Sequence, residues 1–156
     1  IRPLGNGKDR QENVGSARLM AVEASVRLKP WAFLEGRAGW QWLHARRTDA
    51  DPPDDRLEYR PEHKVVASLA VRPLPWLELS SQGTVVGPQD FLHPDTALPM
   101  RLGWYATLDA RVEVRPAPFV TLWVRGTNLT DALYVTEYGH PRPGREILAG
   151  MRVAPM

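Results

Sequence analysis

The side chains that could carry out chemistry are few and widely separated. The four histidines stand at positions 44, 63, 93 and 140, and their spacing matches no zinc motif. Ser80 and Ser81 have no histidine in register that would complete a nucleophile and base pair. The chain has no cysteine, no nucleophile elbow and no phosphate-binding loop. The sequence therefore predicts a protein that is not an enzyme, with no catalytic residue, no metal site and no cofactor.

Two features leave a choice between binding and simple solvation. The segment DADPPDD, residues 49–55, is acidic and could bind calcium through its carboxylates, although its spacing fits no EF-hand. The other interpretation is a solvated loop tip. His93 and His140 fall in predicted loops, where they would either contact a haem or metal chelate or be exposed to solvent.

Composition excludes several classes of protein. The chain has 156 residues, 20 basic and 18 acidic, and a net charge of +2, which is too even to predict nucleic-acid binding. Its 15 prolines and 12 glycines favour a turn-rich chain. It contains no apolar run of 18 residues and no secretory signal pattern. Because the chain begins at Ile1 and not at a methionine, the missing signal pattern says little about targeting.

A repeat with a period of 43 residues organises the chain. KPWAFLE begins at Lys29, RPLPWLELS at Arg72 and RPAPFVTLWV at Arg115. Each copy is a basic residue, a proline, an aromatic residue and an apolar alternation. The residues on either side of each turn alternate between apolar and polar with a period of two, as strands do, and helical periodicity is absent. Each period therefore predicts two long antiparallel strands. A propeller blade is not favoured, because it would need four short strands in the same length.

The alternation predicts seven strands, at about 16–28, 31–46, 62–72, 76–87, 102–115, 119–128 and 145–154. Short turns are expected at Lys29-Pro30, at 72–75 and at 115–118. Long polar loops are expected at 47–61, 87–101 and 128–144. Short turns at one end and long loops at the other are typical of outer-membrane barrels. Several of these strands are longer than the usual globular strand and reach the length that a membrane-spanning strand needs.

Two interpretations of the alternation remain open. A soluble antiparallel sandwich would bury its apolar faces together and could bind a glycan through its aromatic loops. A barrel would turn its apolar face to lipid and its charged face to a wet lumen. The orientation of four apolar residues would distinguish them: Leu34, Leu69, Leu108 and Ile147. An enzymatic barrel is a third possibility, without a catalytic constellation to support it.

Aromatic residues near the strand ends bear on the same choice. Trp40, Trp42 and Trp104 lie on the apolar parity near the long loops, as an interfacial girdle would. Near the short turns, Trp31, Trp76 and Phe119 fall on the opposite parity. Three interpretations are open. These rings cover the inner rim of the barrel, they pack at a strand end, or the turn shifts the phase of the apolar and polar alternation.

The stretch VRGTNLTDALYVTEYGHPRPGRE, residues 124–146, resembles the C-terminal signature of TonB-dependent outer-membrane receptors. That signature has a strand, an Asn-Leu-(Phe/Thr)-Asp turn, a tyrosine, a loop like Gly-x-Pro-x-Pro-Gly-Arg and a final strand. Three upstream segments are also similar to family strands: ENVGSARLMAVEASVRL, LEYRPEHKVVASLAVRP and GWYATLDARVEVRP. The matching residues of the signature are Asn128, Leu129, Thr130, Asp131, Tyr134, Gly139, Pro141, Pro143, Gly144 and Arg145.

The resemblance implies a fold and a division of the chain. It implies an all-β, antiparallel up-and-down meander that is an incomplete part of a 22-stranded transmembrane barrel filled by an N-terminal plug. Residues 1–13 would be the remnant of an extracellular loop, and residues 14–156 the C-terminal barrel segment. Family members commonly end on an aromatic residue, whereas this chain ends MRVAPM.

The resemblance also implies a function. The complete protein would import a scarce ligand such as a ferric siderophore, cobalamin or haem across the outer membrane. Its partners would be outer-membrane lipid, the barrel-assembly machinery, and TonB through the N-terminal region that is not in this chain. The loops would form a ligand-facing vestibule. The expected contacts are Trp104, Tyr134, Tyr138, His140 and Arg142.

Overall fold

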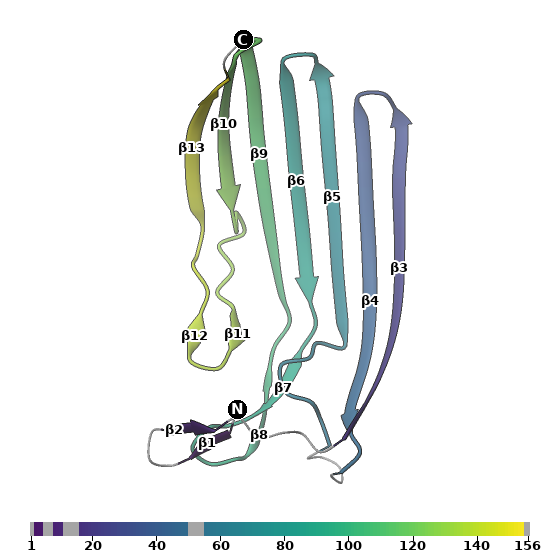
Figure 1. Ribbon diagram of the computed structural model, residues 1–156, viewed down its shortest axis with the longest axis vertical. Coiled ribbons are helices and arrows are strands. Elements are labelled where there is room, and N and C mark those ends of the chain that lie inside the picture. The colour runs from purple at the N-terminus through teal and green to yellow at the C-terminus, as the bar shows by residue number, and fades with distance from the viewer. Residues whose placement is uncertain (1, 5–7, 11–15, 50–54, 155–156) are drawn as a thin grey trace.

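The computed structural model describes residues 2–4, 8–10, 16–49 and 55–154. Its centre is one antiparallel sheet in the order β13-β10-β9-β6-β5-β4-β3, which is an up-and-down meander (Figure 1). This confirms the predicted all-β meander of seven long strands. The ends of the strands differ from the predicted ends by up to three residues. They are β3 (Ala17–Trp31), β4 (Leu34–Arg47), β5 (His63–Leu74), β6 (Leu77–Val86), β9 (Tyr105–Ala117), β10 (Val120–Thr127) and β13 (Glu146–Val153).

Three small hairpins lie at the loop end of the sheet, away from the short turns (Figure 1). Two of them occupy connections that were expected to be irregular, one between β6 and β9 and one between β10 and β13. Among the described residues, no helix is long and apolar enough to cross a membrane. The hairpins are β1 (Arg2–Leu4) with β2 (Lys8–Arg10), β7 (Gln89–Leu92) with β8 (Pro99–Leu102), and β11 (Val135–Glu137) with β12 (His140–Pro141).

The short turns lie later in the chain than predicted, because the strands continue through the basic residue and proline of each repeat. The turns are at residues 32–33, 75–76 and 118–119. Each basic-proline pair, such as Arg72-Pro73, instead forms the two-residue side of a β-bulge opposite one residue of the next strand. Proline lacks a backbone N–H to donate, and a bulge is a position in a sheet that accepts it.

The bulges explain the parity of the aromatic residues at this end. Beyond the bulge in β3, Trp31 pairs with Leu34 and so joins the apolar face. For Trp31, the interpretation that applies is the shift in phase of the apolar and polar alternation. The bulge produces this shift, and the turn does not. Trp76 and Phe119 lie within the turns. The turn carbonyls of Phe33 and Trp76 accept hydrogen bonds from the N–H groups of Arg72 and Arg115, at 2.7 and 2.8 Å, so each hairpin is joined to the next in the same way.

The two faces of the sheet have opposite chemistry. On one face the neighbours across five strands are apolar or small: Val26, Ala38, Ala67, Gly83 and Leu108. On the other, one residue further along, they are Arg27, Arg37, Ser68, Gln82 and Asp109. This separation follows from the two-residue period of the sequence, because register keeps every strand in phase with its neighbour.

The apolar face has no second layer in the described part of the chain. Leu69, Leu108 and Ile147 are 46%, 39% and 69% exposed, and Leu34 is half-buried. The buried hydrophobic side chains of the described residues are only Val86 and Phe91. A sandwich would bury this face against another sheet. The structure therefore does not favour the sandwich, since its apolar residues cover the outside of a single sheet.

Candidate functional site at the loop end of the sheet

The Asn-Leu-Thr-Asp turn is organised by Asn128, whose side chain is buried and fully bonded. Its Nδ2 donates to the carbonyls of Ala132 and Pro143, at 3.0 and 3.2 Å. Its Oδ1 accepts from the N–H of Ala132 at 3.0 Å and from the hydroxyl of Thr130 at 3.1 Å. Asn128 also adopts φ = 47°, a left-handed conformation that asparagine tolerates better than most residues. One side chain thus fixes the start and the end of the last loop.

Asp131 connects the same turn to the final strand. Its Oδ1 accepts the N–H of Arg145 at 2.8 Å, directly before β13 begins. A Cβ on Gly144 would stand 2.9 Å from that oxygen, so a larger residue there would push the carboxylate away from this position. Leu129 lies over Gly126 in a similar way, with no room for a side chain between them. These motif residues therefore position the strand, and none of these contacts leaves a group directed at a ligand.

Tyr134 and Arg142 lie together on the charged side of the loop end. Tyr134 stacks on Tyr105, with ring centroids 4.3 Å apart. Its carbonyl accepts the N–H of Arg142 at 3.0 Å, and the guanidinium of Arg142 donates to the hydroxyl of Thr136 at 3.0 Å. Tyr105 belongs to the charged face of β9. It pairs with Val86, and the adjacent pair, Val85 with Ala106, lies on the apolar face. The arrangement offers two aromatic rings and one cation at the mouth of the charged face.

Tyr138 belongs to a separate aromatic cluster drawn from three loops. Its ring stacks on Phe91 at 5.3 Å, and Phe91 stacks on Tyr59 at 5.6 Å. The Tyr138 hydroxyl lies 3.2 Å from Nε2 of His93, and its N–H donates to the Tyr59 hydroxyl at 3.4 Å. Burial raises the pKa of the Tyr59 phenol above its usual value, while the bond from Tyr138 lowers it. The three loops are thereby held as one unit around Phe91.

Trp104 lies apart from the other predicted contact residues. It stacks on His63 at 6.3 Å, and His63 stacks on Trp40 at 6.0 Å, which forms a row across the apolar face. Trp104 is 59% exposed there. Such a row near the loop end has the geometry of an interfacial girdle. His140 is exposed in the β11–β12 hairpin, where its Nδ1 lies 3.2 Å from the Tyr138 carbonyl.

The acidic loop falls partly outside the described residues, which exclude 50–54. Asp49 and Asp55 at its two ends form ion pairs with Arg47 and Arg46, at 3.1 and 3.2 Å. The described part of the chain contains no group of three side chains that could hold a metal ion. Ser80 and Ser81 pair with residues 70, 69, 111 and 110, none of which is a histidine.

Sequence reasoning missed Tyr59, Phe91 and Tyr105. The strand pattern could have identified Tyr105 as a site residue, because Tyr105 begins β9 at the loop end and belongs to the charged face. Tyr59 and Phe91 carried no comparable signal, since they reach Tyr138 only through the path of two long connections.

The sheet combines an exposed apolar face, a charged face, short turns at one end and long loops at the other. These are the properties of the wall of a β-barrel, and they define the class to which the fold belongs.

Known structures agree with this class. No protein-family model and no curated protein matches the sequence. The ferric-catecholate import receptor Fiu from E. coli K12, in its closed form, superposes with a TM-score of 0.77 over 97% of this chain, at 18% identity. The ferric yersiniabactin uptake receptor FyuA from Yersinia pestis superposes with a TM-score of 0.74 over 88%, at 19% identity. The siderophore receptor PiuA from Acinetobacter baumannii gives 0.69 over 87%, at 17% identity.

The chain has the fold of a segment of these barrels. It spans only 23% of Fiu, 23% of FyuA and 22% of PiuA. The resemblance to TonB-dependent outer-membrane receptors that was identified from the motifs is therefore confirmed at the level of fold.

Proposed function

We propose that this chain is the C-terminal barrel segment of a TonB-dependent outer-membrane receptor that imports a scarce ligand, such as a ferric siderophore, cobalamin or haem. The observation that carries the proposal is the exposed apolar face of a long-stranded sheet whose opposite face is charged. The likeness to import receptors supports it. The segment would belong to a 22-stranded barrel, and residues 1–13 to a loop outside it.

The proposed membrane orientation follows from the distribution of side chains along the strands. Between Met20 and Trp31, the apolar face of β3 extends over eleven residue intervals. At about 3.3 Å per residue and a tilt of about 40°, this corresponds to roughly 28 Å along the membrane normal, close to the hydrocarbon thickness. Trp40 and Trp104 would lie at the outer interface and the short turns in the periplasm. Outer-membrane lipid would then cover the apolar face.

The ligand would meet the charged side of the loop end. We propose Tyr134 and Arg142, together with Tyr105, as contacts at the mouth of the lumen, and Tyr138 and His140 as contacts on the outer loops. Aromatic rings next to a guanidinium suit a ligand that has both an apolar or aromatic part and a negative charge. Trp104, which lies on the apolar face, fits the lipid interface better than a ligand site.

Two further partners belong to the complete receptor. TonB would act through the N-terminal region that precedes this segment, and the barrel-assembly machinery would insert the chain. Neither is expected to contact the residues at the loop end.

The orientation can be tested on adjacent residues of β3. The sequence has no cysteine, so a single substitution gives a unique labelling site. We would place a fluorophore at Val26→Cys on the apolar face and at Ser25→Cys on the charged face, with the chain reconstituted in phosphatidylcholine vesicles. We expect nitroxide-labelled lipid to quench position 26 and aqueous iodide to quench position 25. Equal quenching at both positions by iodide alone would contradict the proposal.

The ligand contacts are tested in the bacterium that carries the complete receptor. Tyr134→Ala and Arg142→Gln should each lower uptake of the ligand, measured as growth under iron limitation and as accumulation of labelled iron chelates. Leu133→Ala is the matched control, because Leu133 is 94% exposed in the same loop. If all three variants take up ligand equally well, these residues do not contact it.

A further inference from the structure

The charged face of the sheet contains a hollow, because three small side chains stand there among longer ones. The hollow has a volume of about 400 Å³. Its floor includes Ser68 and Ala70 on β5 and Ser80 on β6, and all three are half-buried. Since side chains stand roughly perpendicular to a sheet, short ones lower the surface between their longer neighbours. The hollow therefore follows from the residue types at these positions.

Strand register places arginines on both sides of this floor. Arg37 on β4 is the neighbour of Ser68, and Arg111 on β9 is the neighbour of Ser80 on the opposite side. Three strand intervals separate β4 from β9, which at about 4.8 Å each gives roughly 14 Å between the flanking backbones. Two rows of neighbouring residues cross the hollow: Glu35, Ala70, Ser80, Arg111 and Arg125 in one, and Arg37, Ser68, Gln82 and Asp109 in the other.

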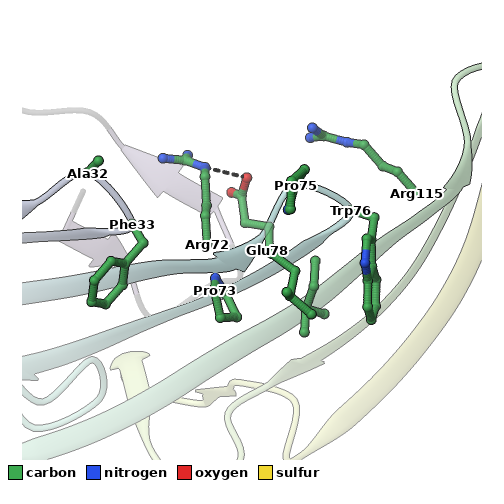
Figure 2. Close-up of a pocket in the computed structure, with 10 residues that line it drawn as sticks. Ala32, Phe33, Arg72, Pro73, Pro75, Trp76, Glu78 and Arg115 are labelled. Carbon is green, nitrogen blue, oxygen red and sulfur yellow. Dashed lines mark hydrogen bonds and ion pairs between the residues drawn. The ribbon is translucent and has the colours of Figure 1, made fainter.

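Positive charge is in excess around the hollow. Figure 2 shows Arg72, on its short-turn side, joined to Glu78 at a distance of 2.9 Å. Next to the hollow, Glu78 and Glu113 are offset by Arg27 and Arg115, so these four groups leave the balance unchanged. The lining itself has more cations than carboxylates, namely Arg37, Arg72, Arg111 and Arg125 against Glu35 and Asp109.

The polar groups of the hollow keep hydrogen-bonding capacity for a bound molecule. Arg37 donates from Nε and one Nη to Glu35, and Arg125 donates from one Nη to Asp109 at 3.5 Å. A guanidinium has five N–H groups, so each arginine retains some that take no part in these bonds. Among the described residues, no hydrogen bond engages three other side chains of the lining, those of Ser68, Ser80 and Gln82.

These groups indicate the chemistry of a ligand. Guanidinium groups match carboxylates in two-bond geometry. Serine hydroxyls and a glutamine amide both donate and accept, as the hydroxyls of a ligand do. A purely apolar molecule would leave these groups unpaired, and a metal ion would be repelled by the excess of cations. The lining therefore suits a small molecule that has both carboxylates and hydroxyls.

A single inorganic anion fits the hollow less well. Arg37 and Arg111 stand on opposite sides of the floor, so they do not converge on one small ion. The hydroxyls of Ser68 and Ser80 lie on the strands between them and would be left without a partner. A longer molecule can engage the arginines at its ends and the serines along its length.

The hollow is separate from the contacts proposed at the loop end. Along β9, Arg111 is six residues from Tyr105, which at about 3.3 Å per residue is roughly 20 Å. From there the hollow extends toward the short turns, because its lining includes Arg72, close to the turn at residues 75–76. A ligand held by Tyr105 and Tyr134 would therefore not occupy it.

We propose that this hollow is a binding site for a small polyhydroxylated acid, whose carboxylates bind the flanking arginines and whose hydroxyls bind the two serines and Gln82. The proposal rests on the proposed function only for the location of the site, which would be inside the complete barrel and nearer to the periplasm than the loop end. A molecule that had passed the loop end would meet the barrel wall a second time at this site.

The test uses the 156-residue chain in micelles of a polyoxyethylene detergent, which has neither charge nor sugar. Three probes with the same carbon skeleton are compared. D-glucarate has a carboxylate at each end and hydroxyls between them, adipate has only the carboxylates, and D-glucitol has only hydroxyls. Binding of each probe is measured by titration with saturation-transfer NMR.

We expect D-glucarate to bind saturably, and adipate and D-glucitol to bind at least about tenfold more weakly. Ser68→Ala combined with Ser80→Ala should lower the affinity for D-glucarate by about tenfold and leave the affinity for adipate unchanged. Arg125→Gln should lower the affinity for both acids by about threefold. Ser25→Ala and Arg152→Gln are the matched controls, because both residues lie on the same face outside the hollow.

Ala70→Tyr distinguishes a site from diffuse attraction between charges. It fills the floor of the hollow and changes no charge, so the affinity for D-glucarate should fall by at least about tenfold. Unchanged affinity would overturn the proposal. If this variant loses its β-sheet circular dichroism, the serine substitutions decide instead, since they remove only the two hydroxyl groups.

The probes themselves give further outcomes that would contradict the proposal. Equal binding of D-glucarate and adipate would show that hydroxyls play no part. Displacement of D-glucarate by inorganic phosphate at a lower concentration than by unlabelled D-glucarate would show a site for small anions. Absence of saturable D-glucarate binding would show that the hollow does not hold a molecule of this class.

The outcome can be separated from that of the proposed function. Lipid quenching at position 26 reports on the apolar face, and D-glucarate binding reports on the hollow in the charged face. Each result can therefore stand or fail without the other.

Discussion

The two ends of the seven-stranded sheet are built in different ways. At the short-turn end, three hairpins repeat one local design, in which a basic-proline bulge, a two-residue turn and a turn carbonyl bonded to the next strand or its end recur. At the loop end, by contrast, the contacts join residues that are far apart in the chain. Tyr59 and Tyr138, for example, are 79 positions apart.

This difference determines how each end should respond to substitution. A repeated local design distributes its stability over many equivalent backbone bonds, so one side chain contributes little. A set of long-range contacts depends on a few side chains, such as Phe91 and Asn128, that are buried and in contact with several segments. Substitutions at the loop end should therefore have larger effects than matched substitutions at the turn end.

The largest effect is expected at Phe91. Phe91→Ala removes a ring that is 3% exposed and stacked between Tyr59 and Tyr138, and we expect it to lower the local free energy of unfolding by about 3 kcal/mol. Hydrogen exchange should then accelerate in all three loops that meet at this ring.

The matched substitution at the turn end is Phe33→Ala. Phe33 is 47% exposed and stacks on Trp31 at 5.8 Å, so its loss should change exchange by much less, and only in its own hairpin. Equal effects at the two positions would remove the distinction between the ends.

The next effect is expected at Asn128. Asn128→Ala removes four side-chain hydrogen bonds and leaves alanine at φ = 47°, so we expect a loss of about 2 to 3 kcal/mol in urea unfolding of the chain in detergent. Leu133→Ala, in the same loop, should stay close to zero because Leu133 is 94% exposed. A loss below about 1 kcal/mol for Asn128→Ala would show that the turn forms without its side chain.

Much of the fold could be predicted from the sequence because the strand period is a local signal. The 43-residue repeat and the two-residue alternation indicated seven strands and the face to which each residue belongs. The predicted turns were a few residues early, because a basic residue followed by proline reads as a turn signal, whereas here it forms a bulge inside the strand.

The loop end was less accessible to sequence reasoning. Asn128 and Asp131 could be recognised as turn residues from their types and from the resemblance. The cluster around Phe91 could not, because the path of the loops brings its members together and no periodicity in the chain records that path. Trp104 was expected both on the apolar parity and among the ligand contacts. Its stacking on His63 agrees with the apolar parity, whereas its contact with a ligand stays a prediction.

A smaller effect is expected at Gly150, near the turn end. Most substitutions at that end should have little effect, but Gly150 makes one close contact. The ring of Trp123 lies against Gly150, and Arg111 lies on that ring. Gly150→Val should therefore lower stability by about 1 to 2 kcal/mol and shift the tryptophan fluorescence. Gly103→Val is the control, because a Cβ there would meet no atom within 4 Å. If Gly150→Val is neutral, the ring moves aside without cost, and Arg111 does not hold it.

The smallest effect is expected at Pro73, within the bulge of the second hairpin. Since the bulge accommodates a residue without a ladder hydrogen bond, alanine fits the same backbone, and Pro73→Ala should lower stability by only about 0.5 kcal/mol through the greater freedom of the unfolded chain. Chemical denaturation would measure this, with Phe91→Ala measured alongside. A loss of 2 kcal/mol or more at Pro73 would mean that the proline itself sets the bulge and the phase of the turn, and the turn end would then depend on single side chains as the loop end does.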